Sequence, residues 1–146
     1  MKILVLNGPN INMLGIREPE IYGKQTYEDL KKLILQNANG VDIDFYQSNH
    51  EGALVDAIQK AYFDGIDGIV FNPGAYTHTS VAILDALKAT KTPCVEVHIS
   101  KVEKRDAFRQ VSYVREACIK TITGEGLNGY VLALEFLKEH LKWKSK

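Results

Sequence analysis

Short apolar runs alternate with segments of helical periodicity along the whole chain, and no other feature constrains the fold as strongly. Runs such as Gly68–Phe71 are apolar throughout, which is typical of strands in a parallel sheet with both faces covered. Five such strands with intervening helices predict one doubly wound α/β domain over residues 1–146. We expect strands at 2–6, 42–47, 68–72, 94–98 and 118–122, and helices at 26–38, 51–63, 78–89, 107–113 and 129–142.

Polar residues collect after the predicted strands, and the strand interiors contain almost none. We expect the flavodoxin-like strand order 2-1-3-4-5, in which the order reverses between the first and third strands. Ligands of such open sheets bind beyond the carboxyl ends of the strands, at that reversal. The polar residues that follow the first, third and fourth strands are Asn7, Asn10, Arg17, Tyr22, Asn72, His78, Glu96, His98, Ser100, Arg105 and Arg109. The pattern therefore predicts a functional site at this edge.

Charge is balanced, with 18 basic and 18 acidic residues. A nucleic-acid or membrane-surface protein would need a basic face, so we expect neither partner. Only one apolar run of four residues, Ile3–Leu6, precedes Asn7-Gly8-Pro9, so neither a signal peptide nor a membrane span is expected there. Cys94 and Cys118 have no CxxC spacing, and we interpret them as core thiols of a cytoplasmic protein.

Residues 8–25 form an unusually long connection between the first strand and the next helical pattern, roughly 18 residues where two to six are common. We interpret this segment as an active-site lid. It contains Arg17 and Tyr22, a cation and a phenol. Forming tyrosinate at pH 7 costs about 4 kcal/mol, and a neighbouring opposite charge typically shifts a pKa by ~1–3 units. The pair is therefore a candidate tyrosinate base; an exposed arginine beside a packed tyrosine is the alternative.

Glu96 and His98 are two residues apart on a predicted strand, so their side chains share one face. Glu96 is therefore expected to orient the His98 ring, as a carboxylate does for a general acid or base. A buried histidine that is merely satisfied by its neighbour is the alternative.

A sharp turn at Asn72-Pro73-Gly74 leads into the third helix, and Thr77 is the predicted N-cap. Free N–H groups at such a helix start favour an anion, although capping alone also explains the pattern. Asp85, farther along the helix, is either a solvated charge or a group that meets another subunit.

Several cofactor motifs are absent from the sequence. It contains no GxGxxG or GxxxxGK[ST] phosphate loop and no GxSxG elbow. The histidines, His50, His78, His98 and His140, are isolated and do not have the spacing of metal ligands. We therefore expect acid–base chemistry on a small molecule without a metal or cofactor.

The chain resembles the type II 3-dehydroquinate dehydratases of the shikimate pathway. The resemblance covers nearly the whole sequence. It depends on LNGPNINMLGIREPEIYG at 6–23, FNPGAYTHTSVAILDAL at 71–87, EVHIS at 96–100, FR at 108–109 and GLNGYVLAL at 126–134. It implies a flavodoxin-like fold, dehydration of 3-dehydroquinate to 3-dehydroshikimate through an enolate, and a homododecamer built of trimers.

The resemblance also implies roles for individual residues. Tyr22 would remove the proton α to the ketone, and Arg17 would favour its tyrosinate form. His98 would protonate the departing hydroxyl, oriented by Glu96 and supported by Asn10. The substrate would be held by Asn72, His78, Arg109, the backbone of Ile99 and Ser100, and Asp85 of a neighbouring subunit.

The sequence departs from the family pattern at two places near the predicted site. Lys101 follows Ser100 where the family usually has asparagine, and Glu125 stands where phenylalanine is common. We interpret Lys101 as a solvated side chain. Two alternatives to a dehydratase are a flavin- or nucleotide-binding module and a catalytically silent relative.

Overall fold

The structure is a computed structural model that describes residues 1–16, 18–101 and 106–144, with the backbone alone described for Ile21, Tyr22 and Lys144. Within these residues the chain forms a five-stranded sheet in the order β2-β1-β3-β4-β5, and every neighbouring pair is parallel. The strands are β1 (Lys2–Asn7), β2 (Asp42–Gln47), β3 (Gly68–Asn72), β4 (Cys94–His98) and β5 (Lys120–Thr123). The predicted fold class and strand order are confirmed.

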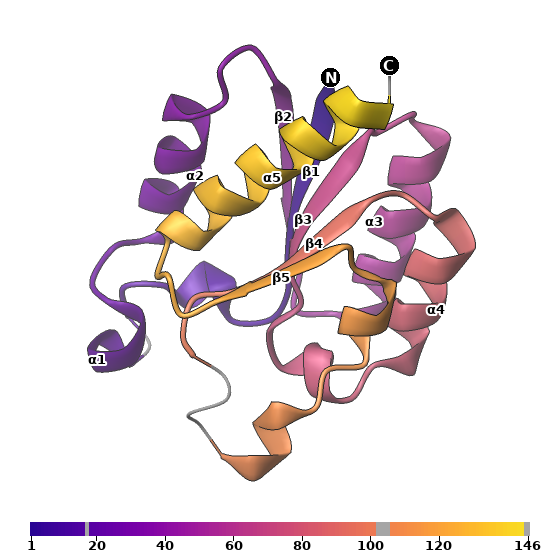
Figure 1. Cartoon of the computed structure of the whole chain (residues 1–146). Coiled ribbons are helices and arrows are strands. Elements are labelled where there is room, and N and C mark those ends of the chain that lie inside the picture. The colour runs from indigo at the N-terminus through magenta and orange to yellow at the C-terminus, as the bar shows by residue number, and fades with distance from the viewer. Residues whose placement is uncertain (17, 102–105, 145–146) are drawn as a thin grey trace.

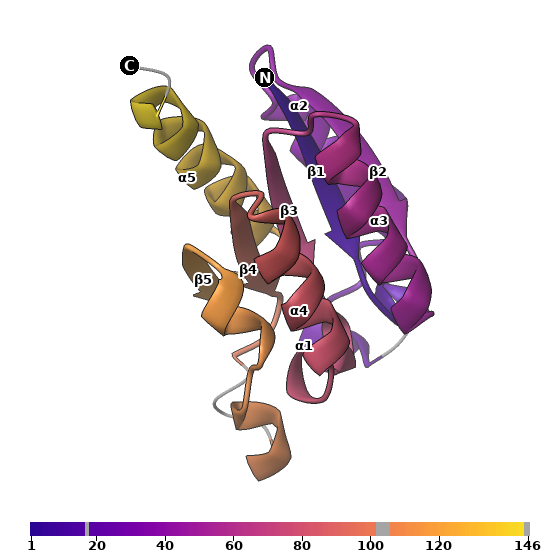
Figure 2. The ribbon, with the colours of Figure 1, turned by 90° about the vertical axis from the view of Figure 1, so that its right-hand side faces the viewer.

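Helices cover both faces of the sheet, with α2 and α5 on one side and α3 and α4 on the other (Figures 1 and 2). The helices are α1 (Pro19–Tyr22), α2 (Tyr27–Gln36), α3 (Glu51–Phe63), α4 (Val81–Thr90) and α5 (Asn128–Lys144). Short 3-10 helices occur at η1 (Ile11–Met13), η2 (Gly74–His78), η4 (Ala107–Gln110) and η5 (Val114–Ala117).

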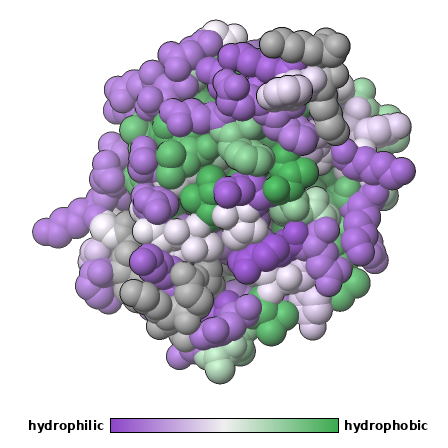
Figure 3. Space-filling view, viewed as in Figure 1, coloured by the Kyte–Doolittle hydropathy of each residue, from purple (hydrophilic) through white to green (hydrophobic). Residues whose placement is uncertain are grey.

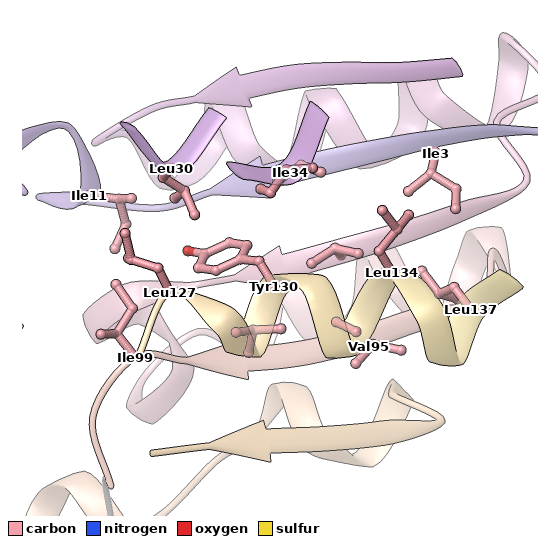
Figure 4. Close-up of a cluster of buried hydrophobic side chains, with 14 of the residues drawn as sticks. Ile3, Ile11, Leu30, Ile34, Val95, Ile99, Leu127, Tyr130, Leu134 and Leu137 are labelled. Atoms are coloured by element: carbon pink, nitrogen blue, oxygen red, sulfur yellow. The ribbon is translucent and has the colours of Figure 1, made fainter. Parts of the chain in front are cut away.

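Two hydrophobic clusters hold these layers together, one on each face of the sheet. The first joins Ile3 and Val95 of the sheet to Leu30 of α2 and Leu134 of α5 (Figure 4). The second joins the opposite face to α3 and α4. Burying one such side chain contributes about 1.5–3 kcal/mol. β1 and β3 are consequently buried almost throughout, which explains their continuous apolar sequences.

The predicted start of the third helix was wrong. Ser80, not Thr77, is the N-cap of α4, and its hydroxyl accepts a hydrogen bond from the Ile83 N–H at 3.0 Å. The chain first makes the 3-10 turn η2, so the α-helix begins three residues later than expected. The Thr77 hydroxyl is thereby freed for a contact with Glu96.

Three other expectations need correction. Residues 107–113 contain a 3-10 turn at Ala107–Gln110 and no α-helix. The last strand begins at Lys120, so Cys118 lies just before it and is half-buried, whereas Cys94 is fully buried in β4. The connection 8–25 is less irregular than expected, because η1 and α1 lie inside it.

Candidate active site

The segments that follow β1 and β3 meet backbone against backbone at the reversal of strand order. Asn7 and Asn72 are register partners, and the Gly8 N–H donates to the Asn72 carbonyl at 2.7 Å. A Cβ atom at Gly8 would lie 2.3 Å from the Pro73 carbonyl oxygen, so only glycine fits there. The two strand ends are held in one fixed arrangement, as a site at this edge requires.

The Glu96 carboxylate contacts the His98 ring at the end of β4, as predicted. Oε2 of Glu96 lies 2.5 Å from Nε2 of His98. Glu96 is completely buried and His98 is 7% exposed. A carboxylate accepts hydrogen bonds, so Nε2 carries the hydrogen and Nδ1 is left to exchange a proton with a ligand.

Hydroxyl groups and a guanidinium from four other segments surround the Glu96 carboxylate. The Ser112 hydroxyl lies 3.2 and 3.1 Å from its two oxygens, and the Thr77 and Thr121 hydroxyls lie at 3.3 and 3.4 Å. Arg115 Nε lies 3.4 Å from Oε1. These groups offer hydrogen bonds to both oxygens, which a carboxylate removed from water requires.

This environment keeps Glu96 ionised. Burial raises the pKa of its carboxyl group, but hydrogen bonds and charges from His98 and Arg115 outweigh burial and lower the pKa to about 2. An ionised Glu96 is the acceptor that fixes the orientation of the His98 ring.

His78 lies close enough to His98, Arg109 and Glu96 for their charges to act on its pKa. Nδ1 of His78 donates to the Val111 carbonyl at 2.6 Å, since a carbonyl oxygen only accepts, and Nε2 is left as the possible acceptor. Burial lowers the pKa of His78, and the charges of His98 and Arg109 lower it further. A mostly neutral His78 near pH 7 is suited to hydrogen bonding with a neutral hydroxyl.

Arg109 has a mostly buried side chain whose Nε is ion-paired with Asp106. Its Nε has no hydrogen-bond partner among the described residues, and Asp106 lies 3.6 Å away. The guanidinium carbon is 5.1 Å from the centre of the Phe108 ring. A guanidinium has five N–H donors in a planar fork, and such a group is suited to binding an anion.

Asn10 lies at the exposed border of this edge in a left-handed conformation, with φ of 71°. Its backbone N–H donates to Asn49 Oδ1 at 3.0 Å. The Gln47 side chain donates to the Gly8 carbonyl at 3.2 Å and to Asn49 at 3.2 Å. The second strand and the segment after it thus brace the first loop, a contribution that sequence reasoning missed.

Tyr130 reaches the same edge from α5 and was also missed. Its hydroxyl donates to Asn7 Oδ1 at 2.6 Å, and Asn72 Nδ2 donates to that hydroxyl at 2.9 Å. In the sequence, Tyr130 occupies a core position of an apolar helix. Nothing in that pattern indicates that its hydroxyl binds Asn7 and Asn72.

The remaining predicted residues differ in how far the structure describes them. Arg17 lies outside the described residues, as does the Tyr22 side chain. Ile99 is buried and Ser100 half-buried directly after β4. Asp85, Lys101 and Glu125 are exposed, which for Lys101 agrees with the predicted solvated side chain.

Other surfaces lie away from these residues. A hollow of about 440 Å³ between β2 and α3 is lined by Tyr46, Asp56 and Lys60 among others, and by none of the predicted site residues. Across residues 1–16, 18–101 and 106–144, no cluster of three or more histidine, cysteine or acidic side chains could hold a metal ion. No helix in the described part of the chain is both long and apolar enough to cross a membrane.

A doubly wound sheet with a buried carboxylate–histidine pair at its carboxyl edge places the chain among the α/β proteins whose functional site lies beyond the strand ends. The dehydroquinase class II family matches residues 1–138. A 3-dehydroquinate dehydratase of Caldicellulosiruptor bescii is 51% identical over 142 residues, covering 96% of this chain and 98% of the relative. One of Clostridium perfringens strain 13 is 49% identical over 146 residues, covering 99% and 100%. The chain belongs to the class II dehydroquinase family.

Solved structures agree with this assignment. The crystal structure of a type II dehydroquinase from Butyrivibrio crossotus is similar with a TM-score of 0.93 and 52% identity, covering 94% of this chain and 97% of that one. The likeness covers 94% of this chain, so the two proteins share the fold.

Proposed function

We propose that this chain dehydrates 3-dehydroquinate to 3-dehydroshikimate in the shikimate pathway, by anti elimination through an enolate. The observation that carries the proposal is the buried Glu96–His98 pair at the end of β4, within a family whose curated relatives are named for this reaction. Two proton transfers, one to a base and one from an acid, account for the chemistry. Both use side chains, so the proposed mechanism needs no metal or cofactor.

In the first step, the Tyr22 phenolate removes the proton on the carbon next to the ketone. The electrons of that C–H bond form an enolate, and Arg17 stabilises both the phenolate and the enolate by its positive charge. We assign residues 8–25 the role of a lid that brings Arg17 and Tyr22 over the substrate.

In the second step, the enolate collapses and the C–O bond to the leaving hydroxyl breaks. His98 gives its Nδ1 proton to that hydroxyl, which departs as water, and the ring carbons form the new double bond. Glu96 stabilises the ring orientation, and Asn10 supports the departing group. Each proton transfer contributes typically about 10²–10⁴-fold to the rate.

In this proposal, the polar groups around Glu96 and His98 bind the substrate. The Arg109 guanidinium would bind the carboxylate, and Asn72 and His78 would bind ring hydroxyls. The backbone N–H groups of Ile99 and Ser100 add further donors at the carboxyl end of β4.

Assembly into a homo-oligomer, with Asp85 completing a neighbour's site, is part of the proposal and follows from the family resemblance. Asp85 is exposed on α4, where another protomer can reach it. Hydrophobic side chains also gather at the centre of the face formed by α5 and β5, and Leu132 and Phe136 are among the exposed ones (Figure 3). We place the enzyme in the cytoplasm, where its biosynthetic pathway would operate.

An ultraviolet assay for the conjugated enone tests the mechanism. Tyr22→Phe and His98→Ala should each reduce kcat by about 10²-fold or more, because each removes one proton-transfer group. Arg17→Ala should move the onset of activity to higher pH, because the phenolate loses a stabilising cation. Near-normal turnover of the Tyr22 or His98 variant would refute the assigned role.

Matched controls separate loss of chemistry from loss of fold. Tyr62→Phe removes an exposed phenol on α3, and His140→Gln removes an imidazole on α5. Neither residue belongs to the proposed machinery, so both variants should keep wild-type turnover. Circular dichroism of all variants should match that of the wild type.

A further inference from the structure

We propose that Tyr130 is a positioning residue, which fixes the orientation of the Asn72 side chain amide at the point where strand order reverses. The inference goes beyond the proposed function and rests on the substrate-binding role that it gives to Asn72. Tyr130 itself lies behind the site, on α5, and would act only through the two asparagines.

The hydrogen bonds around the phenol have one consistent direction. The amide oxygen of Asn7 can only accept, so the single hydrogen of the Tyr130 hydroxyl is donated to it at 2.6 Å. The phenol oxygen must then accept from Asn72, and it does so from Nδ2 at 2.9 Å. On the other side, the Gly74 N–H donates to Asn72 Oδ1 at 3.1 Å.

A flipped Asn72 amide would lose both contacts. Its oxygen would face a phenol oxygen whose hydrogen is already committed, and its NH₂ group would face the Gly74 N–H. The arrangement therefore selects one of two nearly isosteric orientations. The second Nδ2 hydrogen and the second Oδ1 lone pair keep fixed directions for a ligand.

Burial makes this selection strong. Tyr130 and Asn7 are completely buried and Asn72 is 3% exposed, so water cannot replace a lost partner. The phenol lies in the hydrophobic cluster between α5 and the sheet, with its oxygen toward Ile11 and Leu30 (Figure 4). Burial also raises the pKa of Tyr130 well above its usual range, so the hydroxyl keeps the hydrogen that it donates.

The start of α5 approaches the sheet closely enough to allow these contacts. A Cβ atom at Gly129 would lie 3.4 Å from Val97 Cγ1 and 3.5 Å from Ile122 Cγ2. These distances correspond to ordinary van der Waals contact, so the first turn of the helix packs directly against β4 and β5. Tyr130 is thereby carried across to Asn7 and Asn72, which are 123 and 58 residues away in sequence.

A double-mutant cycle on steady-state kinetics tests the inference. Tyr130→Phe keeps the ring and removes only the hydroxyl. If Asn72 binds substrate equally well in the ground and transition states, the variant should raise KM about tenfold with little change in kcat. In an Asn72→Ala background, Tyr130→Phe should change KM less than about twofold, because its only route to the substrate is gone.

The outcomes distinguish the inference from the proposed function. If Asn72→Ala raises KM and Tyr130→Phe adds its full effect to it, Tyr130 does not act through Asn72 and the inference is overturned alone. If Asn72→Ala leaves KM unchanged, the substrate-binding role of Asn72 is overturned and the inference falls with it. If the effects of Asn72→Ala and Tyr130→Phe on KM are not additive, the result supports both the substrate-binding role of Asn72 and the positioning role of Tyr130.

Two further variants keep the test informative. Thr90→Val removes a hydroxyl that donates to the Ala86 carbonyl at 3.0 Å on α4, so it should lower stability without changing KM. Should Tyr130→Phe fail to fold, Asn7→Ala removes the acceptor of the phenol hydrogen and leaves Asn72 intact. It should raise KM in the same non-additive way, and an additive effect would overturn the inference.

Discussion

Replacing Glu96 by glutamine should remove a defined, pH-dependent part of the folding free energy. Glu96 is completely buried, and its folded-state pKa of about 2 lies below the ordinary value of 4.5. A carboxyl group with a depressed pKa stabilises the fold at pH values above its unfolded pKa. That contribution is lost as the pH falls from about 4.5 toward 2, because the unfolded chain binds the proton first.

The size of the effect follows from the shift. A shift of one pKa unit corresponds to 1.36 kcal/mol, so a fall from 4.5 to about 2 contributes about 3 kcal/mol near neutral pH. The wild-type free energy of unfolding should therefore decline by about 3 kcal/mol more than that of Glu96→Gln between pH 5 and pH 2. The glutamine variant is less stable at pH 7, because the amide cannot accept from all the donors around Glu96.

Urea unfolding followed by far-ultraviolet circular dichroism, at one protein concentration and several pH values, measures this difference. Glu116→Gln is the matched control, since Glu116 is an exposed carboxylate 3.6 Å from Lys88. Its curve should run parallel to that of the wild type. A Glu96→Gln curve that also runs parallel to the wild type would refute the assignment of a buried, ionised carboxylate at this position.

Three other predictions concern the frame of the site and its chemistry. Gly8→Ala should destabilise the fold by about 1–3 kcal/mol and lower kcat/KM, because its Cβ would lie 2.3 Å from the Pro73 carbonyl oxygen; unchanged urea unfolding and kinetics would contradict this. Thr26→Ala should cost about 1 kcal/mol in thermal unfolding, because the capping box with Asp29 at the start of α2 is lost; an unchanged melting temperature would count against that cap. Dialysis against a chelator should leave turnover unchanged, and activity that returns only with added metal would overturn the side-chain mechanism.

The sheet could be predicted because its signals are local. Apolar runs are typical of buried parallel strands, and a two-residue spacing on a strand places Glu96 and His98 on one face. Both expectations are confirmed by the strand pairing and by the short carboxylate–imidazole contact.

The contacts that were missed depend on partners far away in sequence. The Thr77 hydroxyl suits a helix cap equally well, and only folding brings it to a carboxylate 19 residues later. Ser112, Arg115 and Tyr130 reach the site through the same kind of long-range contact, which spacing along the chain does not reveal. The roles of Arg17 and Tyr22 stay predictions.

The hydrogen bonds around Glu96 connect the Glu96–His98 pair to one edge of the sheet. Thr121 belongs to β5, a four-residue edge strand paired on one side with β4. An edge of this kind opens more readily than the interior strands. Detachment of β5 from β4 would expose the Glu96 carboxylate to solvent. The His98 ring would then lose the contact that fixes its orientation. Low concentrations of denaturant should therefore abolish turnover while most helices are still folded. Loss of activity would then report the opening of the edge strand β5.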